Sequence, residues 1–212
     1  MKPPFRNALK AALVGLAIMA GRGTPAAAQS VATTTHPPYT PADAQFMTGM
    51  IGHHAQAVLI ANWAPTHGAS PTILRLSERI VAGQGDEIDL MKRWLSDYGE
   101  PVPEGTAHYM AGMDHDMPGM DHGNSMPGML TQEQLAQLDA ARGPEFDRLF
   151  LTFMIQHHKG AIVMVDKLFA TQGAGEEERS FRFASDVYAD QTTEIDRMEK
   201  MLAALPPAGS GQ

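Results

Sequence analysis

The apolar positions along the chain recur with the spacing of an α-helix, and they divide the sequence into four long segments. The segments begin at residues that favour a helix N-terminus, such as Thr40 followed by Pro41, and they end at glycine or proline. The sequence has no run of alternating β-branched residues and no Asn-Gly turn, so strand signals are absent. We therefore predict helices over residues 41–66, 71–98 and 176–205, and a third long helix that follows a break at residues 143–144 and reaches residue 171. A short additional helix is predicted to start with a Thr131–Gln134 capping box.

An internal repeat of a helical hairpin underlies this pattern. Residues 46–54 (FMTGMIGHH) align with residues 150–158 (FLTFMIQHH), and residues 84–91 align with residues 191–198. Each half therefore has a His-His pair on its first helix and a Gln-x-x-Glu-Ile-x-x-Met segment on its second. The expected architecture is all-α: two repeated hairpins form one four-helix bundle over residues 41–205, and a long Met-rich loop over residues 100–130 joins them.

The N-terminus has the pattern of an export signal. Lys2, Arg6 and Lys10 precede an apolar run over residues 11–20, which is too short to span a bilayer, and three alanines at 26–28 offer a cleavage site. We therefore expect a signal peptide over residues 1–28, a linker over residues 29–40 and a short tail over residues 206–212. The mature protein is expected in the periplasm, without membrane insertion after cleavage.

The charge balance excludes some partners. The predicted leader holds four of the 16 Lys and Arg residues and none of the 24 Asp and Glu residues, so the mature chain would carry a formal charge of −12. This charge opposes binding to nucleic acid or anionic lipid and favours cations. Because the chain has no cysteine, a soft metal would have to bind through methionine and histidine.

Polar side chains interrupt the apolar faces of the four helices. At about 100° per residue, both His-His pairs and the Met three residues before each pair fall on the face that should build the core. Burying imidazole or carboxylate there is unfavourable unless each group finds a partner, which a metal ion would supply. Thioether and imidazole together favour copper, particularly Cu(I). The candidate ligands on the helices are Met50, His53, His54, Glu87, Met91, Met154, His157, His158, Met164, Glu194 and Met198.

Each candidate also has a structural interpretation. A His-His pair can be a hydrogen-bonded feature of a metal-free core. Met91 and Met198 fit core packing better than metal binding. His36 and His67 flank predicted helix ends and are expected to be solvated.

The loop over residues 100–130 is the second candidate site. It contains six of the 15 methionines and three of the nine histidines of the chain. Pro-Gly pairs at 118–119 and 127–128 prevent a helix that could pack these thioethers, so we interpret the segment as a metal-capturing strip rather than an incidental linker. Its candidate ligands are His108, Met110, Met113, His115, Met117, Met120, His122, Met126 and Met129.

The two kinds of site should respond differently to acid. Imidazole must be neutral to bind a metal and has an ordinary pKa of about 6.5, whereas a thioether has no proton to lose. We therefore expect the Met-dominated loop to keep Cu(I) in mild acid. The His-His sites are expected to release copper as the pH falls through about 6.

The segments Met50–His54 and Met154–His158 resemble the domain-of-unknown-function 305 family, to which the CopM-like periplasmic copper-binding proteins belong. The resemblance covers nearly all of the chain from residue 43 to residue 202. It implies a ferritin-like four-helix bundle outside the cytoplasm, with copper binding or copper resistance as its role. The family's ligand positions carry over to Met50, His53, His54, Met154, His157, His158 and Met164. The first repeat has Ile60 where the second has Met164, which puts the equivalence of the two sites in doubt.

These observations favour a copper carrier or buffer without catalytic turnover. Its partners would be copper ions, Cu(I) before Cu(II), with Ag(I) as a surrogate, and a periplasmic copper exporter or chaperone. A copper- or di-metal-dependent oxidase is an alternative, although a di-iron carboxylate bundle needs Glu-x-x-His motifs that the sequence lacks. A metal-free helical chaperone or interaction protein is another. The oligomeric state does not follow from the sequence.

Overall fold

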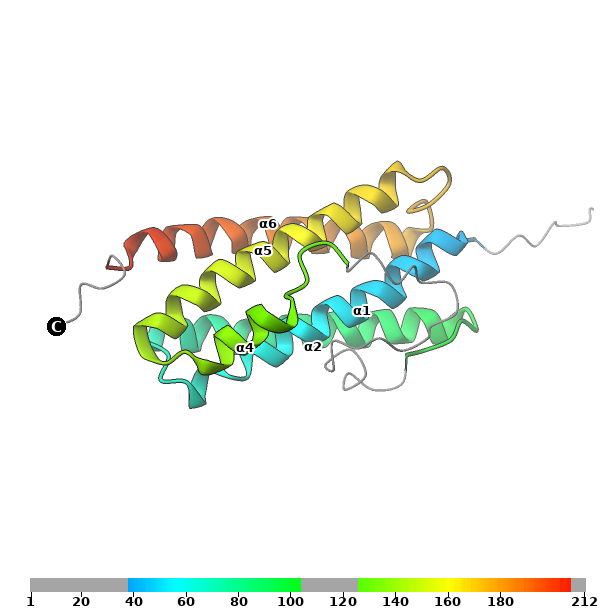
Figure 1. Cartoon of the computed structure of the whole chain (residues 1–212). Helices are drawn as coiled ribbons and strands as arrows, with labels where there is room; N and C mark the ends of the chain where they lie inside the picture. Colours follow the sequence, from blue (N-terminus) through cyan, green and yellow to red (C-terminus); the bar gives the residue numbers. More distant parts are fainter. Residues whose placement is uncertain (1–37, 104–125, 207–212) are drawn as a thin grey trace, which may run out of the picture. The chain divides into compact units, whose positions relative to one another are not determined.

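The residues that the structure describes form helices joined by turns and short loops. A computed structural model describes residues 38–103 and 126–206, and it confirms the predicted all-α class (Figure 1). The elements are α1 (Pro41–Ala61), the 3₁₀ turn η1 (Ala64–Thr66), α2 (Pro71–Asp97), α4 (Gln132–Ala140), α5 (Gly143–Ala170) and α6 (Glu178–Ala204). The predicted leader, the linker up to residue 37, loop residues 104–125 and the tail from residue 207 lie outside the described residues.

The helices begin where the capping residues indicate. Thr40 and Asp43 form a capping box at the start of α1, in which the Asp43 carboxylate accepts a hydrogen bond of 2.8 Å from the Thr40 amide. Ser70 caps α2. Thr131 and Gln134 form the predicted capping box of α4. Proline occupies the first turn of α1, α2 and α5, where its missing N–H removes no helical hydrogen bond.

The end of α1 and the start of α6 differ from the prediction by five and by two residues. Helix α1 ends at Ala61 rather than at residue 66, because Pro65 lacks the N–H that a continuing helix requires and the chain tightens into η1. Helix α6 begins at Glu178, two residues later than predicted. Glu177 is its N-cap, and the Glu177 carboxylate accepts hydrogen bonds from the Ser180 amide (2.7 Å) and the Trp94 indole N–H (2.9 Å).

The helices pack as two hairpins, as the repeat predicts. Helix α1 lies along α2, α5 lies along α6, and α1 contacts α5 across the bundle, with α4 beside α5 (Figure 1). This arrangement confirms the four-helix bundle. In the described ranges, no helix combines the length and the apolar character needed to cross a bilayer.

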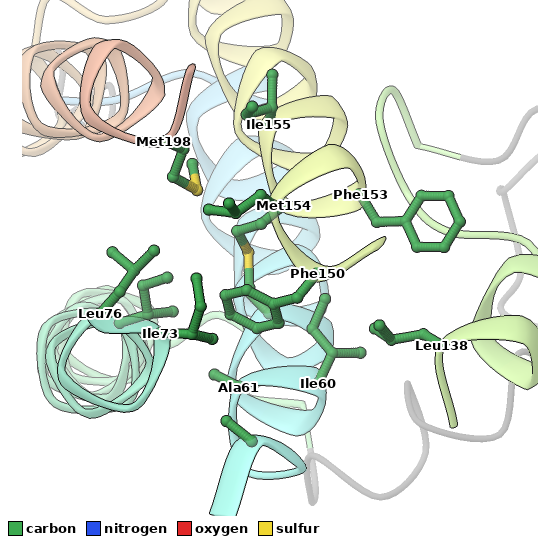
Figure 2. Packing of buried hydrophobic residues seen from close by; sticks show 14 of the residues in the cluster. Ile60, Ala61, Ile73, Leu76, Leu138, Phe150, Phe153, Met154, Ile155 and Met198 are labelled. Carbon is green, nitrogen blue, oxygen red and sulfur yellow. The ribbon is translucent and has the colours of Figure 1, made fainter. Parts of the chain in front are cut away.

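Two clusters of buried apolar side chains form the core. The first, here the Phe150 cluster, includes Ile60 of α1, Ile73 of α2, Phe150 and Met154 of α5 and Met198 of α6 (Figure 2). The second, here the Trp94 cluster, draws on the other half of each long helix. Its members include Met50, Met91, Trp94, Val165 and Val187. Each of the four long helices therefore contributes to both clusters, and the segment between its two contributions lies near the helix midpoint.

His67 is not solvated as expected. Its side chain is buried, and its ring nitrogens lie 2.8 Å from the Trp63 carbonyl oxygen and 3.0 Å from the Asp139 carbonyl oxygen. The ring also contacts Phe146. His67 thus joins the turn after α1 to the end of α4, a connection between residues 72 positions apart that local sequence does not reveal.

Candidate metal centre

A layer of polar side chains separates the two apolar clusters. We call it the polar layer. Its four histidines have no exposed surface, and its two glutamines are almost completely buried. These groups lie near the midpoint of each long helix. They occupy the positions that the hairpin repeat predicts to face inward. The members of the polar layer are His53, His54, Gln84, Glu87, His157, His158, Gln191 and Glu194.

His53 and His157 form the inner pair of the polar layer, at the contact between α1 and α5. Their ring centroids are 3.9 Å apart, and the rings are tilted by 38°. His53 Nε2 lies 2.9 Å from the Pro127 carbonyl oxygen, so it is the donor, and the neutral ring carries its lone pair on Nδ1. That Nδ1 atom, and both ring nitrogens of His157, have no hydrogen-bond partner among the described residues.

Burial keeps this inner pair neutral. Removal from water lowers the pKa of His53 to about 3, with a further contribution from the neighbouring His54. The same desolvation, followed by the proximity of His53, lowers the pKa of His157 well below its ordinary value. The structure therefore changes the expectation that these sites lose metal near pH 6. Both imidazoles stay neutral in mild acid and keep lone pairs available to a metal.

The outer pair is anchored by carboxylates. His54 Nε2 lies 2.6 Å from Glu87 Oε2, and His158 Nε2 lies 2.8 Å from Glu194 Oε2. In each ring the Nε2–H donates to the carboxylate, and neither Nδ1 has a hydrogen-bond partner among the described residues. A carboxylate that holds the far nitrogen of a histidine is the usual support of a metal-binding imidazole.

The charges around Glu194 favour its ionised form. Burial alone would raise the pKa of Glu194, but the hydrogen bond and charge of His158, followed by the charge of Arg79, outweigh it and lower that pKa. The pKa of Asp190 is raised, first by partial desolvation and then by the carboxylates of Glu87 and Glu194. These carboxylates therefore share one region of negative potential between α2 and α6.

The methionine candidates occupy two kinds of place. Met50, Met91, Met154 and Met198 have no exposed surface and lie within the apolar clusters, as Figure 2 shows for Met154 and Met198. Met164 is half-buried. Its methyl carbon and the sulfur of Met126 both approach Gly49, at 3.5 and 3.6 Å from the place a Cβ would take there. Gly49 is one helical turn before His53 on α1, so both thioether side chains lie near the turn that precedes the inner pair.

Residues 126–130, here the strap, lie across α1 and α5. The Gln56 side chain donates to the Leu130 carbonyl (3.2 Å) and accepts from the Leu130 amide (2.8 Å), and the Gln156 amide lies 3.4 Å from the Gly128 carbonyl oxygen. The strap also packs directly on Gly160, where a Cβ would come within 1.9 Å of the Pro127 oxygen. The C-terminal end of the Met-rich loop is therefore fixed over the inner His pair.

The strap contacts were missed by sequence reasoning, although the repeat contains a signal for them. The aligned pairs are Gly52 with Gln156 and Gln56 with Gly160, so glycine and glutamine exchange places between the two halves. At both positions the glutamine holds the strap. Gly160 leaves room for it, and the symmetry of the repeat breaks where the strap crosses.

The structure brings together only some of the predicted ligands. Within residues 38–103 and 126–206, no group of three or more His, Asp or Glu side chains is arranged to hold a metal ion by itself. A site in this region would need the thioethers as well. Met126 and Met129 are half-buried parts of the strap. The remaining loop candidates, His108, Met110, Met113, His115, Met117, Met120 and His122, lie outside the described residues.

Several solved structures match this chain. A DUF305 fragment from Deinococcus radiodurans is 27% identical with a TM-score of 0.63, and the match covers 80% of this chain and 100% of the fragment. A DUF305 protein from Streptomyces coelicolor is 26% identical with a TM-score of 0.61, covering 76% of this chain and 92% of that protein. CopM in its Cu(II)-bound form is 27% identical with a TM-score of 0.58, covering 76% and 95%. CopM has also been solved with Cu(I) and with silver. No curated protein matches the chain.

The family assignment rests on most of the sequence. The model of the domain of unknown function DUF305 matches residues 43–202, a range that contains both hairpins, both His-His pairs and the strap. The predicted resemblance is confirmed, and the chain belongs to the DUF305 family.

Proposed function

We propose that this protein binds copper, Cu(I) in preference to Cu(II), and acts as a carrier or buffer without catalytic turnover. The observation that carries the proposal is the inner pair of the polar layer. His157 is buried with neither ring nitrogen partnered among the described residues, and it lies against His53, whose Nδ1 is also unpartnered. An orphaned buried polar atom costs about 1–3 kcal/mol, and metal coordination would remove that penalty.

The nearby thioethers favour a soft ion. Met126 and Met164 both approach Gly49, one turn from His53, and would supply sulfur ligands to an ion held by the imidazoles. Sulfur and imidazole ligands suit Cu(I), and the similarity to CopM, whose structures contain Cu(I), Cu(II) or silver, supports the same assignment. Glu87 and Glu194 would act as positioning residues, since they orient His54 and His158 without themselves being needed as soft ligands.

The rest of the proposal concerns delivery. The signal-like N-terminus supports export to the periplasm, where a copper exporter or chaperone would exchange copper with this protein. The Met-rich residues 104–125 continue directly into the strap, so a metal captured along the loop would be brought towards the inner pair. In this proposal the loop captures copper and the polar layer retains it.

A competition titration with a Cu(I) chelator tests the proposal. We expect the mature protein to hold more than one Cu(I). A His53→Leu/His157→Leu variant lacks two nitrogen ligands of the inner pair. It should therefore bind the most tightly held Cu(I) at least about tenfold more weakly than the parent. Deletion of residues 104–125, which spares the strap, should lower the number of bound Cu(I) ions. The ion held at the inner pair should remain bound. His67→Gln is the matched control, since it removes a buried imidazole that is hydrogen-bonded elsewhere.

The controls make a negative result interpretable. Far-ultraviolet circular dichroism should show the same helix content in every variant. If the double variant stays folded and keeps the copper affinity of the parent, the inner pair is a structural feature and the proposed site is wrong.

A further inference from the structure

The glutamine and glutamate members of the polar layer also line a second polar feature, which lies between α2 and α6 and belongs to neither apolar cluster. It is a cleft of about 240 Å³, lined by α2 and α6, whereas the strap contacts α1 and α5. The residues at its centre are related by the hairpin repeat: Gln84 matches Gln191, and Glu87 matches Glu194. Arg79 and Asp190 complete its polar lining.

The cleft is negatively charged. Glu87, Glu194 and Asp190 contribute three carboxylates against the single guanidinium of Arg79, which lies 3.3 Å from Glu194. Like charges that line one small cleft repel each other more strongly than charges in open water. A bound cation would relieve this repulsion.

Two buried amides point to a ligand independently of the charge. Gln84 is 3% exposed and Gln191 is 2% exposed, and both line the cleft. Neither the oxygen nor the nitrogen of the Gln84 amide has a partner among the described residues, and the Gln191 oxygen is likewise unpartnered. Buried amide groups are almost always hydrogen-bonded, so a pair of unpartnered ones at symmetry-related positions requires an explanation.

We propose that this cleft binds a hard divalent cation of the Mg²⁺ type, which keeps part of its water shell. The oxygen atoms of carboxylates and amides are the ligands such ions take, and Mg²⁺ is commonly held by one or two carboxylates through retained waters. Retained water fits the geometry, because no three acidic or histidine side chains in the described ranges converge for direct coordination. The space is sufficient, since one ordered water needs only about 10–15 Å³ of it. The unpartnered Gln84 N–H would donate to such a water.

With this site, the bundle would offer oxygen ligands for a hard cation and sulfur ligands for a soft cation at different places. The cleft offers oxygen ligands on α2 and α6, whereas the thioethers of Met126 and Met164 gather where α1 and α5 meet the strap. Glu87 and Glu194 also orient the outer His pair of the polar layer. The inference itself does not rest on copper binding, because the unpartnered amides of Gln84 and Gln191 and the carboxylate of Asp190 are not candidate copper ligands.

Titration of the metal-free mature protein with Mn²⁺, followed by electron paramagnetic resonance of the free ion, tests the proposal. We expect a single saturable site from which Mg²⁺ displaces Mn²⁺. Asp190→Asn should weaken Mn²⁺ binding about tenfold, through the loss of one carboxylate charge. Gln84→Leu/Gln191→Leu should abolish the rise in melting temperature that Mn²⁺ gives the parent protein. Asp186→Asn is the matched control, since Asp186 is an exposed carboxylate one turn before Asp190 that does not line the cleft.

The outcomes separate this proposal from the copper proposal. Cu(I) affinity should be the same in the parent and in Asp190→Asn, because Asp190 is not a member of the polar layer. The proposed cation site is wrong if the parent shows no saturable Mn²⁺ binding. It is also wrong if Asp186→Asn weakens binding as much as Asp190→Asn, because the ion would then be held by the general acidity of the surface.

Discussion

Because the strap packs closely on α5, we expect a glycine-to-alanine substitution beneath it to destabilise the protein. The same substitution in α2, away from the strap, should stabilise it. Gly160 lies inside α5, and a Cβ added there would stand 1.9 Å from the Pro127 oxygen, 2.4 Å from the Pro127 carbonyl carbon and 2.6 Å from Gly128 Cα. These are backbone atoms, so they cannot move aside as a side chain would. Gly160→Ala should therefore lift the strap from α5. Gly85, in α2, has no neighbouring atom within 4 Å of its added Cβ.

The magnitude follows from the contacts that hold the strap. Lifting it would break the His53–Pro127 hydrogen bond and the two bonds between Gln56 and Leu130. At about 1 kcal/mol each, these bonds amount to roughly 3 kcal/mol. Alanine is a better helix former than glycine by about 1 kcal/mol, which offsets part of the loss. We expect Gly160→Ala to lower the free energy of unfolding by roughly 2 kcal/mol, and Gly85→Ala to raise it by about 0.5–1 kcal/mol.

Urea unfolding of the metal-free protein, followed by the fluorescence of its two tryptophans, measures both changes. A Gly160→Ala/Gln56→Leu double variant shows whether the loss comes from the strap, because a strap that is already lifted gains nothing from Gln56. The effects of the two substitutions should then be clearly less than additive. If Gly160→Ala is as stable as Gly85→Ala, the strap does not press on α5 and the reasoning fails.

Three further predictions follow from the polar groups. The pKa of His53 is about 3 in the folded chain and about 6.5 when unfolded, so the unfolded state binds more protons in between. The metal-free protein should therefore lose stability as the pH falls below about 6.5, by up to roughly 1.4 kcal/mol per pH unit for each such histidine. In thermal melts, the melting temperature of His53→Leu/His157→Leu should depend less steeply on pH than that of the parent. Copper held by the inner pair should survive dialysis at about pH 5, because its imidazoles stay neutral there. It should do so even when the methionines at residues 110, 113, 117 and 120 are replaced by leucine. Complete loss of metal from that variant would contradict the neutral imidazoles. Asp43 accepts hydrogen bonds from Thr40, the Gly175 amide and Ser180. Asp43→Asn should therefore lower the free energy of unfolding by about 2–3 kcal/mol. Urea unfolding measures this change, with the exposed Asp186→Asn as the control.

The features that could be predicted from the sequence are local or periodic. Thr40, Ser70 and Thr131 act through hydrogen bonds to residues three positions ahead, so their capping roles can be identified without a structure. The hairpin repeat predicts the inward face of each long helix because all four share one spacing. The burial of the His-His pairs follows from that spacing.

The features that could not be predicted depend on contacts between distant residues. His67 lies at a helix end, where solvation is the usual outcome, but Asp139 and Phe146 bury it. The position of the strap depends on Gln56 meeting Leu130 across 74 residues, and nothing in the Met-rich segment itself indicates where it is held. The low pKa of His53 similarly arises from burial by parts of the chain far from it.

The polar layer also has a consequence for how the helices align along their length. If α1 slid past α5 by one helical turn, about 5.4 Å, His53 would leave His157 and enter one of the apolar clusters, while an apolar residue would take its place. Apolar side chains of similar size tolerate such sliding, because one Ile or Met replaces another at little loss. A buried histidine in an apolar cluster is strongly disfavoured, so a single polar layer at mid-height fixes the helix register that the two apolar clusters alone would leave loosely defined.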